Sequence, residues 1–171
     1  GMSTIVRENG HRKLGLVEAG YLLDDLSLEI IADGIHLPPE LLKLILKLKD
    51  HDRICLVTDS MRGADMPDGP SLLGSLAHGV SVIIKDGIAN MPSFDCFAGS
   101  VATTDRLVRT MTAKAGLPMW EAVKMASLNP AVFLGIDDMY GSIEPGKSAD
   151  LLIFDEEVHI SSVYVSGVRV S

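Results

Sequence analysis

The sequence predicts an α/β chain that ends in a small β unit. Ile54 to Val57 is a short apolar run, β-branched at two of its four positions and bounded by charge, which is typical of a strand buried on both faces. A second predicted strand, 28–36, and a predicted helix, 38–49, come before it, so the order is strand, helix, strand. If the two strands are parallel, their connection is right-handed. From Gly141 onward, turn residues and alternating β-prone residues replace the helical pattern.

The N-terminal residues 3–13 are polar and contain glycine, which predicts a loop. This stretch carries a basic cluster made of Arg7, His11, Arg12 and Lys13. Arginine in such a cluster suits an anionic group such as a phosphate, because the guanidinium offers a bidentate fork. The alternative is an ordinary solvated loop.

Three further elements follow in order. Residues 14–23 have apolar side chains on most faces and predict a short, mostly buried helix. Residues 28–36 form a strand whose polar residues gather at its C-terminal end, where His36 lies. Residues 38–49 form a helix, since proline is tolerated in a first helical turn and leucine and isoleucine supply an apolar stripe.

Asp59 stands where the buried strand ends, and this position makes it a candidate for chemistry. In parallel α/β architectures the carboxyl ends of the strands form the rim of the active site. His36 follows the neighbouring strand, so both side chains are expected at the same end. The alternative for Asp59 is a structural one, in which its carboxylate caps the turn over 60–63.

The middle of the chain interrupts the strand and helix alternation. Glycine and proline over 61–75 predict a long mobile loop directly after Asp59, in a position where loops commonly cover a site. Residues 76–98 are a β excursion, in which Asp86-Gly87 predicts a hairpin turn. Helices are then expected over 103–115 and 118–127, with a short third helix beginning at Asn129.

The predicted tail contains a turn and strand over 141–155 and a hairpin over 163–170. We therefore expect two domains, with 1–140 as the α/β part and 141–171 as strands of a small β domain.

Composition narrows the class of protein. The formal charge of −8 argues against a nucleic-acid partner, which calls for a basic stripe. No apolar run approaches the ~20 residues that a membrane span needs. The two cysteines, Cys55 and Cys96, have neither metal-site spacing nor a disulfide pattern, and the histidines also lack ligand spacing. We expect a cytoplasmic protein.

Several motifs together carry a resemblance to a known family. The segment 141–155, Gly-Ser-Ile-Glu-Pro-Gly-Lys-Ser-Ala-Asp-Leu-Leu-Ile-Phe-Asp, resembles the closing segment of the amidohydrolase superfamily, whose members are metal-dependent hydrolases built on a (β/α)8 barrel with a small β-sandwich. The stretches 31–36, 56–60, 98–100 and 129–131 narrow the resemblance to the N-acetylglucosamine-6-phosphate deacetylases, over nearly the whole chain.

The resemblance implies roles for individual residues. Asp59 matches the acid/base aspartate after the last barrel strand, which moves a proton from the attacking water to the departing amine. His36 matches a substrate-contacting histidine, and Arg12 matches an arginine associated with the sugar phosphate. Residues 97–104 match a segment that lines the sugar pocket.

The resemblance also implies what this chain lacks. Relatives hold a divalent metal, zinc or iron, through ligands that lie upstream of the matched part, so we expect no metal ligand and no bound metal here. The chain is then the C-terminal portion of a barrel, with the last two strands and the adjoining helices. Ile30, Ile54 and Leu56 are expected to form an orphaned interior face that drives homo-oligomer formation.

The resulting functional prediction is metal-assisted hydrolysis of an acetamide on an amino-sugar phosphate, by a chain that is inactive alone. Two alternatives stay open. One is another amidohydrolase, dihydroorotase-like or deaminase-like. The other is a non-catalytic folded remnant that only self-associates.

Overall fold

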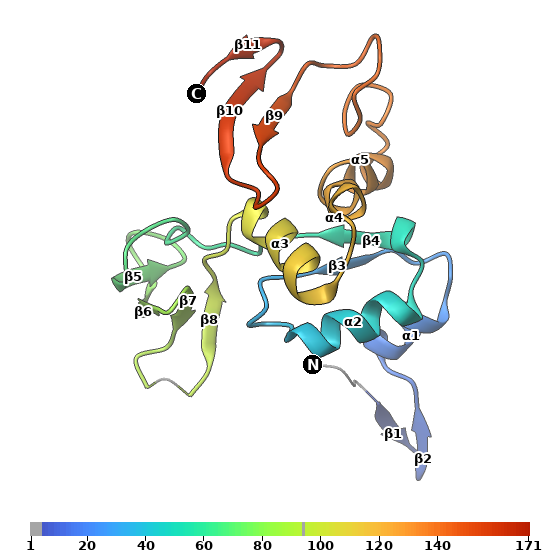
Figure 1. The fold of residues 1–171 in the computed structure, drawn as a ribbon. Coiled ribbons are helices and arrows are strands. Elements are labelled where there is room, and N and C mark those ends of the chain that lie inside the picture. The colour runs from blue at the N-terminus through green and yellow to red at the C-terminus, as the bar shows by residue number, and fades with distance from the viewer. Residues whose placement is uncertain (1–4, 94) are drawn as a thin grey trace.

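The body of the protein is built around two parallel strands, β3 (Leu28–Ile30) and β4 (Ile54–Leu56). The computed structural model describes residues 5–93 and 95–171. Helices pack about the strand pair, and three antiparallel sheets surround this body (Figure 1). The predicted α/β class is confirmed. Within the described residues the parallel sheet holds only β3 and β4, so no barrel closes.

The helices lie close to their predicted positions. No helix in the described part of the chain is both long and apolar enough to cross a membrane. In chain order the helical elements are α1 (Leu16–Leu22), α2 (Pro39–Leu48), the 3-10 turn η1 (His51–Arg53), α3 (Thr104–Thr110), the π-helical turn η2 (Met111–Ala115), α4 (Met119–Ala126) and α5 (Leu128–Leu134).

The main hydrophobic core lies where α2, α3, η2 and α4 pack with the parallel strands. Ile30, Ile54 and Leu56 are all buried in this cluster. The expectation that these three side chains form an orphaned face is therefore wrong. They fill the core with Leu42, Ile45, Leu107, Met111 and Met125. The opposite face of the strands carries Glu29, which is exposed beside the buried Cys55.

Helix α1 is more exposed than predicted. Its only buried residue is Gly20, while Leu16 and Leu22 are exposed. The apolar residues lie on most faces of α1, but the body covers one face only. The buried ammonium of Lys49, just after α2, joins α1 to the body by donating to the carbonyl oxygens of Gly20 at 2.9 Å and Leu23 at 2.6 Å.

The N-terminal stretch is a hairpin and not the predicted loop. Strands β1 (Val6–Glu8) and β2 (His11–Lys13) pair antiparallel, while residues 3 and 4 of the predicted loop lie outside the described residues. Asn9 and Gly10 form the turn with φ of 50° and 81°. Positive φ at both positions is the geometry that Asn-Gly favours in a two-residue hairpin.

The β excursion is larger than predicted. Strands β5 (Gly69–Leu73), β6 (Val80–Lys85), β7 (Ile88–Asn90) and β8 (Phe97–Ser100) form a four-stranded antiparallel sheet in that order. The predicted Asp86-Gly87 turn is confirmed, with φ of 55° and 75°. The predicted mobile loop over 61–75 is wrong for 69–73, because Pro70 lies in β5, an edge strand, where proline is tolerated.

The C-terminal strands form a third sheet. Strands β9 (Leu151–Phe154), β10 (Ile160–Val165) and β11 (Val168–Arg169) pair antiparallel in the order β11-β10-β9. Val158, between β9 and β10, is buried in the main core, and its carbonyl oxygen accepts from Nη1 of Arg109 at 2.8 Å. The division into domains at residue 140 stays a prediction.

A charged cluster at η1 joins the α2–β4 connection to α4. Nδ1 of His51 lies 2.6 Å from Oε1 of Glu121, and Nε2 lies 3.0 Å from the carbonyl oxygen of Leu46. A carboxylate and a carbonyl can only accept, so both ring nitrogens donate and the imidazole is a cation. Partial burial lowers the pKa of His51, but the hydrogen bonds with Glu121 and Leu46 and nearby negative charge outweigh it and raise the pKa above its ordinary 6.5.

This raised pKa predicts a pH dependence of stability. The folded state holds the proton of His51 more tightly than the unfolded chain does, so the stabilisation is complete below about pH 6.5. It is lost as the pH rises through the raised folded pKa. We expect the urea midpoint of the wild type to fall more between pH 6 and pH 8 than that of His51→Gln.

The control for this experiment is His78→Gln, because the ring of His78 has no hydrogen-bond partner among the described residues. The urea midpoint of His78→Gln should fall between pH 6 and pH 8 as much as that of the wild type. If the urea midpoints of the wild type and His51→Gln fell equally between pH 6 and pH 8, the conclusion that the His51 imidazole is a cation would be contradicted.

Candidate functional site

The carboxyl ends of β3 and β4 deliver two polar segments to one edge of the body. Leu28 pairs with Ile54 and Ile30 with Leu56 in parallel register. The amide of Val57 then donates to the carbonyl oxygen of Ile30 at 3.0 Å, which continues the pairing by one residue. Segments 33–36 and 58–60 therefore leave the sheet at the same end. We call this edge the rim.

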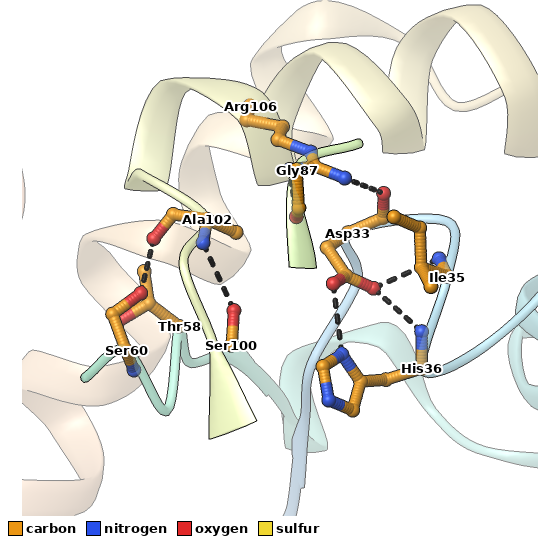
Figure 2. A network of polar contacts seen from close by, with 9 residues as sticks. All are labelled: Asp33, Ile35, His36, Thr58, Ser60, Gly87, Ser100, Ala102 and Arg106. Atoms are coloured by element: carbon orange, nitrogen blue, oxygen red, sulfur yellow. Dashed lines mark hydrogen bonds and ion pairs between the residues drawn. The ribbon is translucent and has the colours of Figure 1, made fainter. Parts of the chain in front are cut away.

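On the β3 side of the rim, Asp33 organises the segment that contains His36. The Oδ1 atom of Asp33 accepts from the amides of Ile35 at 2.9 Å and His36 at 2.8 Å. Its Oδ2 atom lies 2.8 Å from Nδ1 of the His36 ring. Figure 2 shows the three contacts converging on one carboxyl group. The predicted strand 28–36 ends at Ile30, and the remainder turns around Asp33.

The Asp33 carboxyl is buried and yet charged. Its side chain is 0% exposed, whereas that of His36 is 17% exposed. Burial raises the pKa of Asp33, but hydrogen bonds from the His36 ring and from the amides of Ile35 and His36 outweigh it and leave the pKa below its usual value. The group is thus a carboxylate at neutral pH, and it can only accept hydrogen bonds.

The β5–β8 sheet and α3 reach this unit from two sides. The rings of His36 and Phe97 lie 5.2 Å apart between centroids, tilted by 60°. Arg106 of α3 donates from Nη2 to the carbonyl oxygen of Asp33 at 3.4 Å and from Nη1 to that of Gly87 at 2.9 Å (Figure 2). One guanidinium therefore connects the Asp33 turn to the β6–β7 hairpin. His36 also lines an apolar cavity of about 320 Å³ beside α1, and Asp59 is not among its lining residues.

On the β4 side of the rim, Asp59 is exposed and has a φ of 47°. Among the described residues, no hydrogen bond or ion pair engages its carboxylate, so the alternative of a cap for the turn over 60–63 has no supporting contact. Its neighbour Ser60 is fixed, because it pairs in parallel with Ser100 and its hydroxyl donates to the carbonyl oxygen of Ala102 (Figure 2). Aspartate tolerates this left-handed backbone conformation better than most residues, and Asp65 and Asp86 also have positive φ.

The predicted site residues are brought together only in part. His36 and Asp59 follow neighbouring parallel strands onto one rim, although no hydrogen bond joins them within 5–93 and 95–171. Arg12 lies on β2, directly opposite Arg7, in the exposed hairpin that projects from the body beyond α1 (Figure 1). No hydrogen bond or ion pair in the described part of the chain connects Arg12 to the rim.

The described residues do not fit a metal ion. No group of three or more His, Cys, Asp or Glu side chains in these ranges is arranged to hold one. The divalent ion that the resemblance implies therefore has no ligand set among the residues of the rim or elsewhere in this part of the chain.

Sequence reasoning did not single out Asp33 or Arg106 as site residues. The position of Asp33, three residues before His36, could have predicted this contact, because that spacing lets the carboxylate reach both the amide and the ring of the histidine. Arg106 gives no such signal, since its contact to Asp33 spans 73 residues.

Comparison with known proteins identifies related chains. The profile described as Amidohydrolase family matches residues 6–170. A putative N-acetylgalactosamine-6-phosphate deacetylase of Escherichia coli strain K12 is 38% identical over 157 residues, which cover 92% of this chain and 90% of that protein.

Two solved structures match with similar geometry. The N-acetylglucosamine-6-phosphate deacetylase of Thermotoga maritima gives a TM-score of 0.82 at 37% identity, covering 92% of this chain and 42% of that one. A mutant of the Mycobacterium smegmatis N-acetyl-D-glucosamine-6-phosphate deacetylase, in complex with N-acetyl-D-glucosamine-6-phosphate, gives 0.82 at 29% identity, covering 91% and 40%. The chain thus spans about two fifths of the length of these two enzymes.

Proposed function

Because this chain belongs to the amidohydrolase family, we propose that it forms the C-terminal part of an N-acetylhexosamine-6-phosphate deacetylase. The reaction is hydrolysis of the acetamide to a hexosamine 6-phosphate and acetate. The observation that carries the proposal is Asp59, an exposed carboxylate with φ of 47° at the end of a buried parallel strand, on the same rim as the Asp33–His36 pair.

Asp59 is the proposed proton carrier. As water adds to the acetyl carbonyl carbon, the Asp59 carboxylate takes one proton from that water. It then gives the proton to the amine nitrogen as the C–N bond breaks, so the acid and base steps use the same group. Its lone pairs are available for this task, because no described residue donates a hydrogen bond to its carboxylate.

His36 and Arg12 are the proposed substrate contacts. The ring of His36 is held through Nδ1 by Asp33, which leaves Nε2 for the sugar. Arg12 is exposed and its guanidinium makes no ion pair among the described residues, so its bidentate fork is available for the phosphate. An amino-sugar phosphate is also the ligand named for the matched M. smegmatis structure.

The test is a chimera in which this chain replaces the matching part of the T. maritima deacetylase. We expect a folded, metal-loaded chimera to release amine from N-acetylglucosamine 6-phosphate or N-acetylgalactosamine 6-phosphate, while the isolated chain shows no turnover. A chimera with native spectra and bound metal that acts on neither sugar would contradict the proposal. Such a result would favour the non-catalytic alternative.

Self-association is part of the proposal and makes a separate prediction. The apolar strip over 132–143 is exposed, so association would remove it from water. Its exposed members are Val132, Phe133, Leu134, Ile136, Met139, Tyr140 and Ile143. We expect sedimentation coefficients of the purified chain to rise with concentration.

The variant Phe133→Ser/Leu134→Ser should weaken this association. Leu76→Ser is the control, because Leu76 is also exposed but lies in the β5–β6 connection. A monomer at every concentration would overturn the prediction.

We propose a cytoplasmic location. Both cysteines, buried Cys55 and exposed Cys96, are free thiols. Free thiols are the usual state in reducing compartments.

A further inference from the structure

The protein contains two Asp–His pairs of the same construction, one buried and one exposed. In the exposed pair, Oδ1 of Asp155 accepts from the amides of Glu157 and His159, each at 2.9 Å, and Oδ2 lies 3.0 Å from Nδ1 of His159. The two carboxylate oxygens are used as in the Asp33–His36 pair, although the histidine lies four residues after Asp155 and three after Asp33. The side chains of Asp155 and His159 are 57% and 65% exposed, however, so water competes for every contact.

We propose that Asp33 is a positioning residue that fixes His36 in the tautomer protonated on Nδ1 and leaves Nε2 unprotonated. The carboxylate accepts only, and its Oδ1 already receives two amide protons. Oδ2 faces Nδ1 at 2.8 Å, so that nitrogen must carry the hydrogen. The buried carboxylate admits no water as a substitute partner.

Two further contacts hold this arrangement in place. Arg106 donates a hydrogen bond to the main-chain carbonyl of Asp33, which restrains the turn that carries the carboxylate. The ring of Phe97 lies beside that of His36 at 5.2 Å, which limits rotation of the imidazole. The histidine is therefore preorganised before any ligand arrives.

The tautomer decides what His36 recognises. With Nδ1 protonated, the neutral ring presents a lone pair at Nε2, which accepts a hydrogen bond from a hydroxyl or an amide N–H of the ligand. This statement about the ligand rests on the proposed function, whereas the tautomer itself rests on the contacts of Asp33 alone.

The experiment is long-range 1H–15N correlation NMR of the histidine rings in the full chain, at a pH where titration shows the rings to be neutral. The His36 signals are assigned by their loss in His36→Gln. In the wild type we expect a pyrrole-like Nδ1 and a pyridine-like Nε2 for His36, and exchange-averaged signals for exposed His159. A protonated Nε2 with an unprotonated Nδ1 in wild-type His36 would overturn the proposal.

Asp33→Asn supplies the second readout. Its amide oxygen can keep the two backbone N–H groups, and its NH2 then donates to Nδ1, so we expect the protonated nitrogen of His36 to switch to Nε2. Asp155→Asn is the matched control and should leave the His36 signals unchanged. An Asp33→Asn variant with a native fold and an unaltered His36 pattern would overturn the proposal, and if this variant does not fold, the wild-type spectrum decides.

Addition of N-acetylglucosamine 6-phosphate to the metal-loaded T. maritima chimera separates this inference from the proposed function. We expect the ligand to shift the Nε2 resonance of wild-type His36 more than the Nδ1 resonance. With the Nδ1-protonated tautomer established, a ligand that leaves both resonances unmoved would contradict the substrate role of His36, while the positioning role of Asp33 would stand.

Discussion

Asp59→Asn in the T. maritima chimera is expected to lower kcat by at least the ~10²–10⁴-fold that general acid–base catalysis contributes, with KM little changed. Asparagine keeps the size of the side chain and tolerates the φ of 47° at this position. It loses the basicity needed to take a proton from water. The measurement is steady-state kinetics of amine release at full metal loading.

Two variants give this result its meaning. Asp65→Asn is the matched control, because Asp65 is also exposed with a positive φ of 60°, but lies beyond the rim in the connection after Ser60. It should retain near-normal kcat. His36→Asn should raise KM and lower kcat together. Near-normal kcat for Asp59→Asn would reduce Asp59 to a structural residue, even if the chimera hydrolyses the proposed sugars.

Asn129→Leu is expected to give the largest loss of stability among the single substitutions considered. The buried Nδ2 of Asn129 donates to the carbonyl oxygens of His51 and Ile54, each at 2.8 Å, and so joins α5 to η1 and β4. Leucine has a similar volume but no donor. The carbonyl of Ile54 is the buried one, and losing its donor costs about 1–3 kcal/mol, whereas the carbonyl of His51 keeps the amide of Ile54 as a donor.

Urea unfolding at pH 7 measures this loss as a lower midpoint with an unchanged slope. Lys124→Met is the control, since it breaks the ion pair with Asp52 at 2.6 Å between α4 and η1, where the Asp52 partner is exposed. Exposed ion pairs typically contribute only about 0–1 kcal/mol. If both variants lose the same stability, the buried amide is not what joins these elements.

Local patterns explain the parts of the site that could be predicted. The apolar period and the proline of α2 predict a strand, helix, strand unit, and a parallel pair must bring the residues that follow both strands to one edge. His36 and Asp59 could be named for that reason. The Asn9-Gly10 dipeptide is also a hairpin-turn signal in the sequence. The charged residues on either side of it, however, lack the β-prone pattern that usually accompanies such a turn.

The remainder of the site depends on contacts between distant parts of the chain. The hydroxyl of Ser60 reaches the carbonyl of Ala102, 42 residues away, and this contact anchors the β5–β8 sheet beside Asp59. Nothing near Ser60 in sequence specifies that partner. The exposed position of Arg12 likewise follows from the projecting hairpin, which no local period could place relative to the rim.

The ammonium of Lys49 has a consequence for how the native state opens. It is buried, and its hydrogen bonds go to Gly20 and Leu23, in and just after α1. If α1 detached by itself, this charge would lose both hydrogen bonds, and a hydrogen bond to a charged group typically contributes about 1.5–3 kcal/mol. Local unfolding should therefore release α1 and the end of α2 as one cooperative unit. In native-state hydrogen exchange, the slowest amides of both helices should share one opening free energy.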